Sequence, residues 1–169
     1  MIEDLLIRAE RSGDEPAISG VISAAFRQAR HASGTEAAIV SNLREARALT
    51  VSMVAEVRDE IVGHVACSPV EINGRSEGVM GLAPVSVLPA WQGRGVGSLL
   101  VRLALAELAT SGAIGCVVLG DLEFYGRFGF VRSEGLSYPP APAEYFGVKR
   151  LTEADLPVGV VTYHSAFDG

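Results

Sequence analysis

The sequence has little of what would point to an exported or membrane-bound protein. Only two of its 169 residues are cysteines, Cys67 and Cys116, and both lie in apolar runs. We therefore expect two buried thiols in a reducing cytoplasm and no disulfide. No apolar run approaches the ~18 residues that a membrane span needs. The first residues carry acids and lack a small-residue cleavage site, which argues against a signal peptide. A cytoplasmic location is the prediction.

Runs of basic residues are also absent, and the formal net charge is −6. A general role on nucleic acid or on a membrane surface is therefore not expected. Internal repeats, low-complexity segments and linkers do not stand out either. A chain of this length suits one domain with a sizeable core, so we predict a single domain over residues 1–169. No metal is predicted.

The chain does contain a clear succession of apolar segments separated by turn signals. Their patterns predict strands over 5–9, 49–58, 61–72, 79–88, 114–119 and 158–164, with 145–151 as a further candidate. Helices are expected from Asp14, from Ser33 to about Arg47, from the glycine-rich stretch to Gly112, and over 121–127. The third helix is expected to bury Val96, Leu99, Leu100, Leu103 and Ala106. This order predicts a mixed α/β (α+β) sheet: an antiparallel N-terminal meander, one parallel βαβ crossover and C-terminal strands.

The stretch QGRGVGS, residues 92–98, places three glycines where a helix is about to begin. Glycine is costly in ordered backbone, so something must require it. A glycine-rich turn at a helix N-terminus exposes several N–H groups and favours an anion. Gly93, Gly95 and Gly97 therefore predict a pyrophosphate cradle, and a tight turn with nothing bound is the alternative. Neither a P-loop nor a dinucleotide-binding fingerprint fits the spacing and context.

Two blocks of the sequence resemble the GNAT superfamily of N-acetyltransferases. VSVLPAWQGRGVG, residues 85–97, is similar to its acetyl-CoA motif, V-x-P followed by Q-x-x-G-x-G. VLGDLEFYGRFGF, residues 118–130, resembles its Y-x-x-x-G-F block in the wording of the YhbS-like branch. Residues 62–64, 68–70 and 159–167 are similar to that branch too, so the resemblance spans almost the whole chain. It implies a GNAT-like fold, acetyl-CoA as co-substrate, and acetyl transfer to a primary amine of a small molecule or peptide. A homodimer stays open.

The resemblance also implies roles for individual residues. The backbone of 85–87 would pair with the pantetheine arm, and the N–H groups of 93–98 would hold the pyrophosphate. The implied cofactor-binding set is Val85, Ser86, Val87, Gln92, Gly93, Arg94, Gly95, Val96, Gly97 and Ser98. A backbone N–H near Val87 is the expected oxyanion donor. Tyr125 is implied as the general acid, because a phenol stays protonated at neutral pH. Packing beside Phe124 and Phe128 is the alternative for Tyr125.

The general base cannot be assigned from the sequence. Many relatives carry an acid on the strand before the V-x-P, but residues 81–85 read GLAPV. Deprotonation through water, by the substrate or by another residue all stay open. Glu36 is the nearest acidic candidate for contact with the acceptor amine. Ser33-x-x-Glu36 also fits a capping box, in which Glu36 would return to the N-cap N–H.

Several other polar residues have plainer expected roles. His31 is expected in a solvated loop, and His64 as a hydrogen-bonded residue in a strand. His164 is a minor candidate for the acceptor side, and Asp121 is expected to cap the short helix. Cys116 lacks any neighbour in sequence that would lower its pKa, so a nucleophilic role is not expected.

Two alternatives concern the chemistry of the whole site. Arg127 could contact a CoA phosphate or pair with an acid. A CoA-binding sensor or interaction module that has lost turnover is the rival class of function, because one fold hosts many functions.

Overall fold

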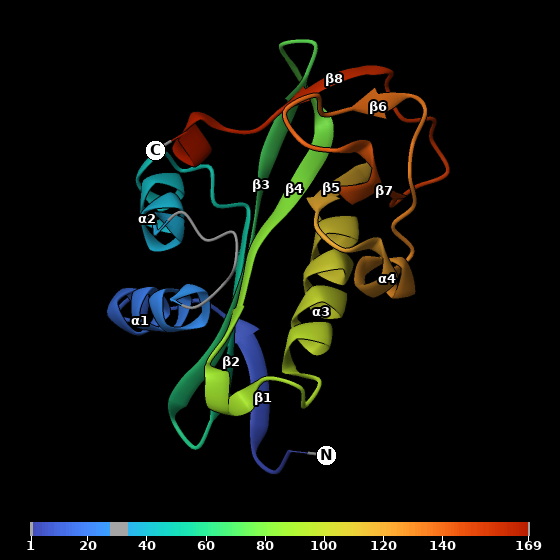
Figure 1. Cartoon of the computed structure of the whole chain (residues 1–169). Helices are drawn as coiled ribbons and strands as arrows, with labels where there is room; N and C mark the ends of the chain where they lie inside the picture. The colour runs from blue at the N-terminus through green and yellow to red at the C-terminus, as the bar shows by residue number, and fades with distance from the viewer. Residues whose placement is uncertain (1, 28–33, 169) are drawn as a thin grey trace.

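The computed structural model describes residues 2–27 and 34–168, which form an eight-stranded sheet flanked by helices (Figure 1). Six strands follow one path in the order β1-β2-β3-β4-β5-β7, β8 pairs with the end of β3, and β6 pairs with β8. The strands are β1 Leu5–Ala9, β2 Val51–Val57, β3 Glu60–Ile72, β4 Arg75–Val87, β5 Gly115–Leu119, β6 Leu136–Ser137, β7 Phe146–Arg150 and β8 Gly159–Thr162. The pairs from β1 to β4 are antiparallel, whereas β4 and β5 are parallel. The predicted mixed sheet is confirmed.

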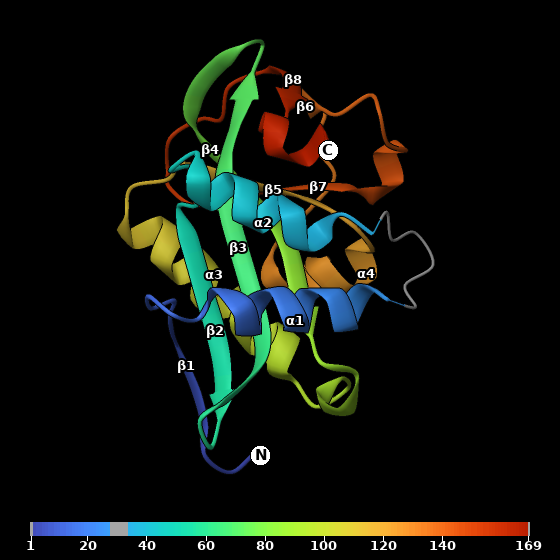
Figure 2. The same ribbon diagram turned by 90° about the vertical axis from the view of Figure 1, so that its left-hand side faces the viewer.

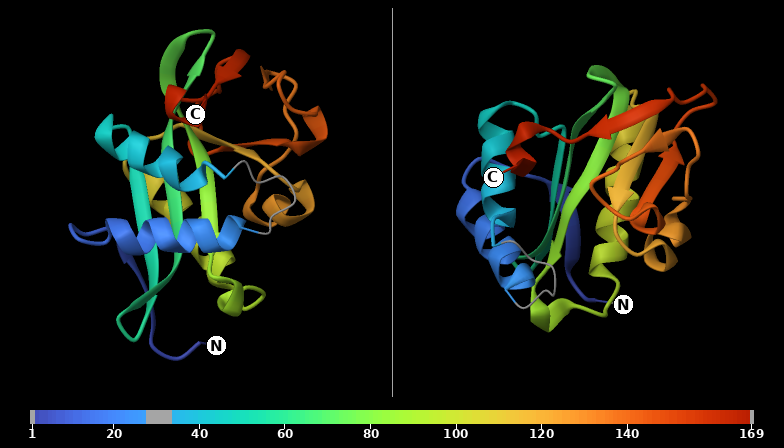
Figure 3. Two further views of the ribbon diagram at one scale, coloured as in Figure 1. Left: turned by 60° about the vertical axis from the view of Figure 1, so that its left-hand side comes forward. Right: turned by 45° about the horizontal axis from the view of Figure 1, so that its top comes forward.

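Helices cover both faces of the sheet. Helices α1, Glu15–Phe26, and α2, Glu36–Glu45, lie across one face (Figure 2), and α3, Val96–Thr110, packs on the other (Figure 1). The short helix α4, Leu122–Tyr125, follows β5 on the side of α3. Both views of Figure 3 show the same layers. The largest apolar cluster lies between α3 and the sheet, and a second one joins α1 and α2 to β2 and β3.

The buried face of α3 differs from the predicted one. Leu99 and Leu103 are 36% and 37% exposed, and Ala106 is exposed too. The buried residues are Val96, Leu100, Val101, Ala104, Leu105 and Leu108. The prediction is confirmed for Val96 and Leu100 and wrong for Leu99, Leu103 and Ala106. Apolar residues occur around most of this helix, so their periodicity does not select one face. The sheet selects it: a Cβ on Gly63 of β3 would lie 3.0 Å from Leu100 Cδ1, so the helix approaches the sheet closely there.

Element boundaries follow local turn chemistry. β4 begins at Arg75 rather than 79, because Asn73 and Gly74 both have positive φ, 51° and 82°, and form a two-residue hairpin turn that pairs Ile72 with Arg75. Asp121 caps α4 as predicted, its side chain accepting the N–H of Glu123 at 2.9 Å. β7 confirms the candidate strand near 145–151, and the two-residue β6 was not predicted.

The N-cap of α2 is not the residue that the predicted capping box requires. Glu36 is the first helical residue and Thr35 is the N-cap, so Glu36 does not stand three residues after the cap. Ser33 lies outside the described residues, as does His31. A carboxylate in the first turn still stabilises a helix through its dipole.

Cys67 and Cys116 are buried free thiols, as predicted. Within residues 2–27 and 34–168, none of the helices has the length and apolar character needed to cross a membrane.

Candidate active site

The sheet opens where β4 and β5 part. The two strands pair over only three residues each, Val79–Gly81 with 115–117. β4 then runs on to Val87 along β3, whereas β5 leads into α4 (Figure 1). β4 also carries one extra residue here, because Val65 pairs with Val85 but Cys67 pairs with Leu82. In the described part of the chain no strand pairs with the β5 side of 82–87. Such an edge can take up an extended ligand as an added strand.

A cavity of about 330 Å³ lies at the end of this edge. It is bounded by the turn after β4, the first turn of α3, and α4. Its lining is Val87, Trp91, Gln92, Gly93, Gly95, Val96, Gly97, Ser98, Phe124 and Arg127. Most of the predicted cofactor-binding residues therefore meet around one hollow. Val85, Ser86 and Arg94 are not among the lining residues. Val85 and Ser86 precede Val87 on β4, and the side chain of Arg94 stacks on the Trp91 ring, 4.6 Å from its centroid.

The three glycines of the cradle are required for different reasons. Gly93 and Gly95 have φ of 72° and 87°, a backbone region that favours glycine, so the turn itself explains them. Gly97 lies in the first turn of α3 without a positive φ, and a Cβ there would make an ordinary 3.7 Å contact with Val87 Cγ2. Glycine in a helix costs about 1 kcal/mol relative to alanine. A tight turn alone therefore leaves Gly97 unexplained, whereas an anion approaching the free N–H groups explains it.

Arg127 lies on the rim of the same cavity. Its guanidinium stacks on the Phe124 ring, 4.8 Å from the centroid, and both residues line the hollow. Among the described residues no carboxylate pairs with Arg127. Of the two predicted alternatives, the geometry favours a position from which Arg127 can meet an anionic ligand. Stacking on an aromatic ring leaves the guanidinium donors available in its plane.

Tyr125 is the last residue of α4 and belongs to an aromatic cluster. Its ring packs edge-to-face on Phe124 and Phe130, with centroids 5.0 and 5.8 Å away. Burial raises the pKa of Tyr125 to about 12, and the nearby Cys116 contributes to the rise. The phenol is therefore a hydrogen-bond donor at neutral pH. The predicted aromatic packing is confirmed, and it positions the ring without excluding an acid role.

Other predicted candidates have structural partners or are inert. The Nδ1 atom of His164 accepts the N–H of Ala166 at 3.0 Å, so this histidine closes the C-terminal turn. Cys116 is fully buried, and burial raises its pKa well above the ordinary value, so it is a thiol rather than a thiolate. Glu36 lies on α2, outside the cavity that gathers the glycines. In the described part of the chain no group of three or more His, Cys, Asp or Glu residues could hold a metal ion.

A chain of hydrogen-bonded polar residues that the sequence did not predict lies on the face of the sheet opposite α3. His64 is fully buried, and its Nε2 atom lies 2.8 Å from Ser52 Oγ. Ser52 donates to Glu10 Oε1 at 2.7 Å, and Glu10 accepts two hydrogen bonds from Arg44, at 2.7 and 2.9 Å. His64 lies in a strand and is hydrogen-bonded through Nε2, as expected, but its Nδ1 atom has no partner among the described residues. Polar residues inside apolar strands, at 52, 64 and 86, were the available signal.

The comparisons with known proteins agree on the family. The family model of the acetyltransferase (GNAT) domain matches residues 49–132. The uncharacterized N-acetyltransferase YhbS of Escherichia coli K12 is 34% identical over 97% of this chain and 99% of its own length. The crystal structure of YhbS from E. coli in complex with CoA superposes with a TM-score of 0.91 at 32% identity, covering 100% of this chain and 94% of that one.

A second solved structure is more similar in sequence than YhbS. It is a GNAT family acetyltransferase from Brucella melitensis in complex with acetyl-CoA, 47% identical with a TM-score of 0.87, and the match covers 97% of this chain and 98% of that one. Similarity of this extent, over nearly the full length, includes both blocks that carry the predicted site. The chain belongs to the GNAT family of N-acetyltransferases, in the branch that contains E. coli YhbS.

Proposed function

We propose that this protein transfers the acetyl group of acetyl-CoA to a primary amine, in the cytoplasm, by direct attack of the amine on the thioester. One observation carries the proposal: the β4 edge that pairs with no described strand ends at a cavity. Gly97 lines this cavity, although the fold itself does not require a glycine there. The Brucella and E. coli relatives, crystallised with acetyl-CoA and CoA, support the same ligand for this chain.

Each part of the cavity has a part of the cofactor to hold. Residues 85–87 would hydrogen-bond the amides of the pantetheine arm as an added strand. The N–H groups of 93–98 would bind the pyrophosphate, helped by the positive end of the α3 dipole. Arg127, on the cavity rim, would add a charged contact to a phosphate. The fit is good, because the described lining residues offer donors and a cation to an anionic ligand and include no carboxylate.

The residues around the opening supply what acetyl transfer needs. The cofactor brings an activated acetyl thioester. A backbone N–H near Val87 would stabilise the negative charge on the carbonyl oxygen. As the C–N bond forms and the C–S bond breaks, Tyr125 would donate its proton to the departing sulfur. Glu36, at the start of α2, is proposed only as a neighbour of the acceptor amine, which would be a small molecule or a peptide.

One observation favours a rival, a CoA-binding module without turnover. The β4 segment 81–85 carries no carboxylate, so it lacks the base that many family members place there. The two classes separate in one experiment: release of free thiol from acetyl-CoA with a panel of primary amines, beside the shift in melting temperature that acetyl-CoA causes. Both classes predict a higher melting temperature. Only the enzyme predicts amine-dependent thiol release, and protection without release would establish the rival.

A further inference from the structure

We propose that His64, held by Ser52 and Glu10, is the base that receives the proton of the acceptor amine through a water molecule bound beside Ser86. The proposal deepens the acetyltransferase function and rests on it, because the proton comes from the attacking amine. It supplies the base that β4 lacks. The base would lie on β3, with its supporting residues on β2 and directly after β1.

The hydrogen bonds fix the tautomer of His64. The Glu10 carboxylate can only accept, and Arg44 supplies two donors to it. The single proton of the Ser52 hydroxyl is donated to Glu10, so Ser52 Oγ must accept from His64. The imidazole therefore carries its proton on Nε2. Its Nδ1 atom is left as an unprotonated acceptor, buried and without a partner among the described residues.

Strand register places His64 next to the β4 segment that is proposed to bind the cofactor. His64 is paired with Ser86 on β4, and residues directly opposite each other share one face of a sheet. Ser86 lies between Val85 and Val87, which pack toward α3 on the other face. Ser86 Oγ is also buried without a partner in the described structure. Two such polar atoms on neighbouring strands are the setting in which a buried water is found.

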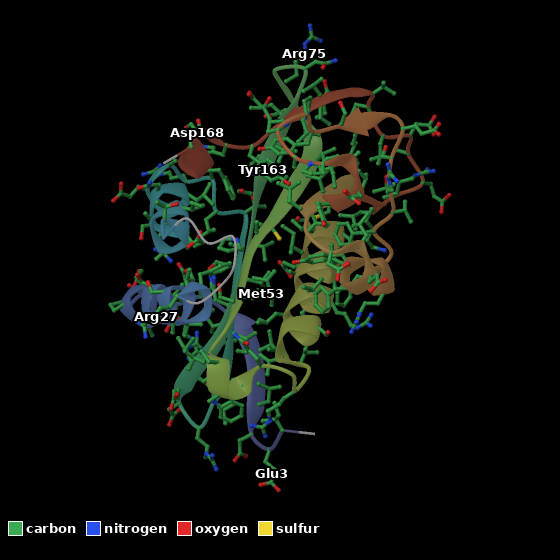
Figure 4. All side chains as sticks on the ribbon, in the orientation of Figure 1. Glu3, Arg27, Met53, Arg75, Tyr163 and Asp168 are labelled. Carbon is green, nitrogen blue, oxygen red and sulfur yellow. The ribbon has the colours of Figure 1, made fainter. Side chains whose placement is uncertain are left out.

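The same face stays polar up to the point where β4 and β5 part. Ser68 is paired with Gly81, and its hydroxyl is buried with no partner among the described residues. Tyr163 lies against Gly81, whose added Cβ would be 2.7 Å from Tyr163 Cε1; Figure 4 labels this tyrosine beside β3 and β4. Its hydroxyl is likewise buried and unpartnered within the described residues. Unsatisfied buried groups are rare in native proteins, so several on one face indicate a hydrated or ligand-binding interior.

The series of hydrogen bonds that begins at His64 ends at the protein surface. Glu10, Arg44 and Ser52 line an open cavity of about 770 Å³ at the β1–β2 edge. Burial alone raises the pKa of Glu10, but the hydrogen bonds from Arg44 and Ser52 outweigh it and leave the pKa below its usual value. Glu10 is therefore ionised at neutral pH. Its negative charge can offset a positive charge on His64 across the Ser52 hydroxyl.

The proton balance closes without another reactant. The amine loses one proton to the water at Ser86 as its nitrogen bonds to the acetyl carbon, and that water passes a proton to His64 Nδ1. His64 becomes an imidazolium that keeps its Nε2 proton. After the products leave, His64 releases this proton to solvent water, and Tyr125 takes back from solvent water the proton that it gave to the sulfur. Burial lowers the pKa of His64 to about 4, so the ring is neutral and ready at pH 7. A weak base suffices, because a nitrogen bonded to the acetyl carbon has lost most of its basicity.

The kinetic test compares three substitutions with one matched control, using the amine that gives the fastest thiol release with the wild-type protein. His64→Gln keeps a donor near the Nε2 position but removes the Nδ1 acceptor, and we expect the single-turnover rate to fall about 10²-fold. Ser52→Ala should lower it about tenfold, through loss of the tautomer lock. Ser52→Thr, which keeps the hydroxyl, should restore it to within about twofold of wild type. The affinity for acetyl-CoA should stay unchanged throughout.

Cys67→Ala is the control, because Cys67 is equally buried on the same strand but packs in the cluster with α3 on the other face of the sheet. It should keep the wild-type rate, and a loss as large as that of Ser52→Ala would overturn the proposal. A folded His64→Gln protein with a rate near wild type would also overturn the proposal. In either case, thiol release by the wild-type protein would still support the acetyltransferase function.

A readout independent of turnover covers the case in which His64→Gln fails to fold or no amine is accepted. Nitrogen-15 NMR of the imidazole in the wild-type protein should show the Nε2–H tautomer. In Ser52→Ala the signals should move toward a mixture of the two tautomers. An Nδ1–H tautomer or an imidazolium in the wild-type protein at pH 7 would sink the proposal, because Nδ1 could then not accept a proton.

Discussion

The ring of Tyr125 lies directly against the backbone of Gly120: a Cβ at Gly120 would stand 2.7 Å from Tyr125 Cε2. Real Cβ atoms essentially never approach a ring carbon so closely, so the Tyr125 ring can occupy this position only if residue 120 is glycine. Gly120 follows β5 and precedes α4. The connection between the two elements therefore sets where the proposed acid lies.

Gly120→Ala should displace Tyr125 and lower the single-turnover rate about tenfold or more, since small misplacements of a reacting group are costly. Gly126→Ala is the matched control. Gly126 directly follows Tyr125, has a negative φ of −59°, and has open space where a Cβ would go. Its rate should equal that of the wild type. Equal rates for both variants, measured by stopped-flow thiol release, would show that the position of Tyr125 is unimportant.

Removing only the hydroxyl tests the acid role itself. Tyr125→Phe should lower the single-turnover rate about 10²-fold, the low end of what one positioned proton donor contributes. Acetyl-CoA affinity should stay nearly constant, because the packed ring remains and the hydroxyl acts mainly in the transition state. Tyr145→Phe, at a tyrosine that is 48% exposed, is the control and should have no effect.

The pKa of Tyr125 adds a pH expectation. Because burial raises it to about 12, the phenol stays protonated throughout pH 7 to 10. With an amine that is already neutral, the wild-type rate should show no loss from Tyr125 ionisation over this range. Full activity of Tyr125→Phe across the same pH range would mean that the thiolate leaves unprotonated or takes its proton from water.

The parts of the site that are contiguous in sequence were predictable, and the parts assembled by strand register were not. The cradle occupies seven consecutive residues, 92–98, and its glycines announce the helix start. Glu10, Ser52 and His64 come from three separate segments. Their meeting depends on a register shift between Ala55 and Glu56 that no local pattern reveals. The prediction of the buried face of α3 was partly wrong for a related reason: packing against the sheet decides which of its apolar residues are buried.

Gly97 offers a test in which stability and binding should move in opposite directions. Gly97→Ala should stabilise α3 by up to about 1 kcal/mol, because alanine is the better helix former. The new methyl group meets Val87 at an ordinary 3.7 Å, so the fold accepts it, but it enters the lining of the cavity. Affinity for acetyl-CoA should fall about tenfold or more, an expected loss of about 1.4 kcal/mol.

Gly20→Ala is the matched control for this helix effect. Gly20 lies inside α1 with nothing within 4 Å of an added Cβ, and it does not line the cavity. Both variants should raise the melting temperature by a few degrees at most. Only Gly97→Ala should weaken acetyl-CoA binding in calorimetry. Unchanged affinity in Gly97→Ala would mean that no ligand approaches this turn and that the glycine has no role in binding.

Gly95→Asp tests the electrostatics of the cradle. Gly95 is the N-cap of α3 with φ of 87°, and open space surrounds the position of its missing Cβ. A carboxylate there would enter the cavity and repel a pyrophosphate, so acetyl-CoA binding should be abolished while the domain still folds. Gly13→Asp separates this repulsion from backbone strain. Gly13 has a similar φ of 99° and equally open surroundings but lies before α1.

Both variants carry the cost of a left-handed residue, about 1–2 kcal/mol, so both should melt at similar, slightly lower temperatures. Only Gly95→Asp should lose acetyl-CoA binding, measured by calorimetry and by protection against melting. Added salt should weaken the repulsion and recover part of the affinity, because exposed charges are screened within about 10 Å at 0.1 M ionic strength. A folded Gly95→Asp protein with wild-type affinity would remove the basis for a phosphate site at this helix start.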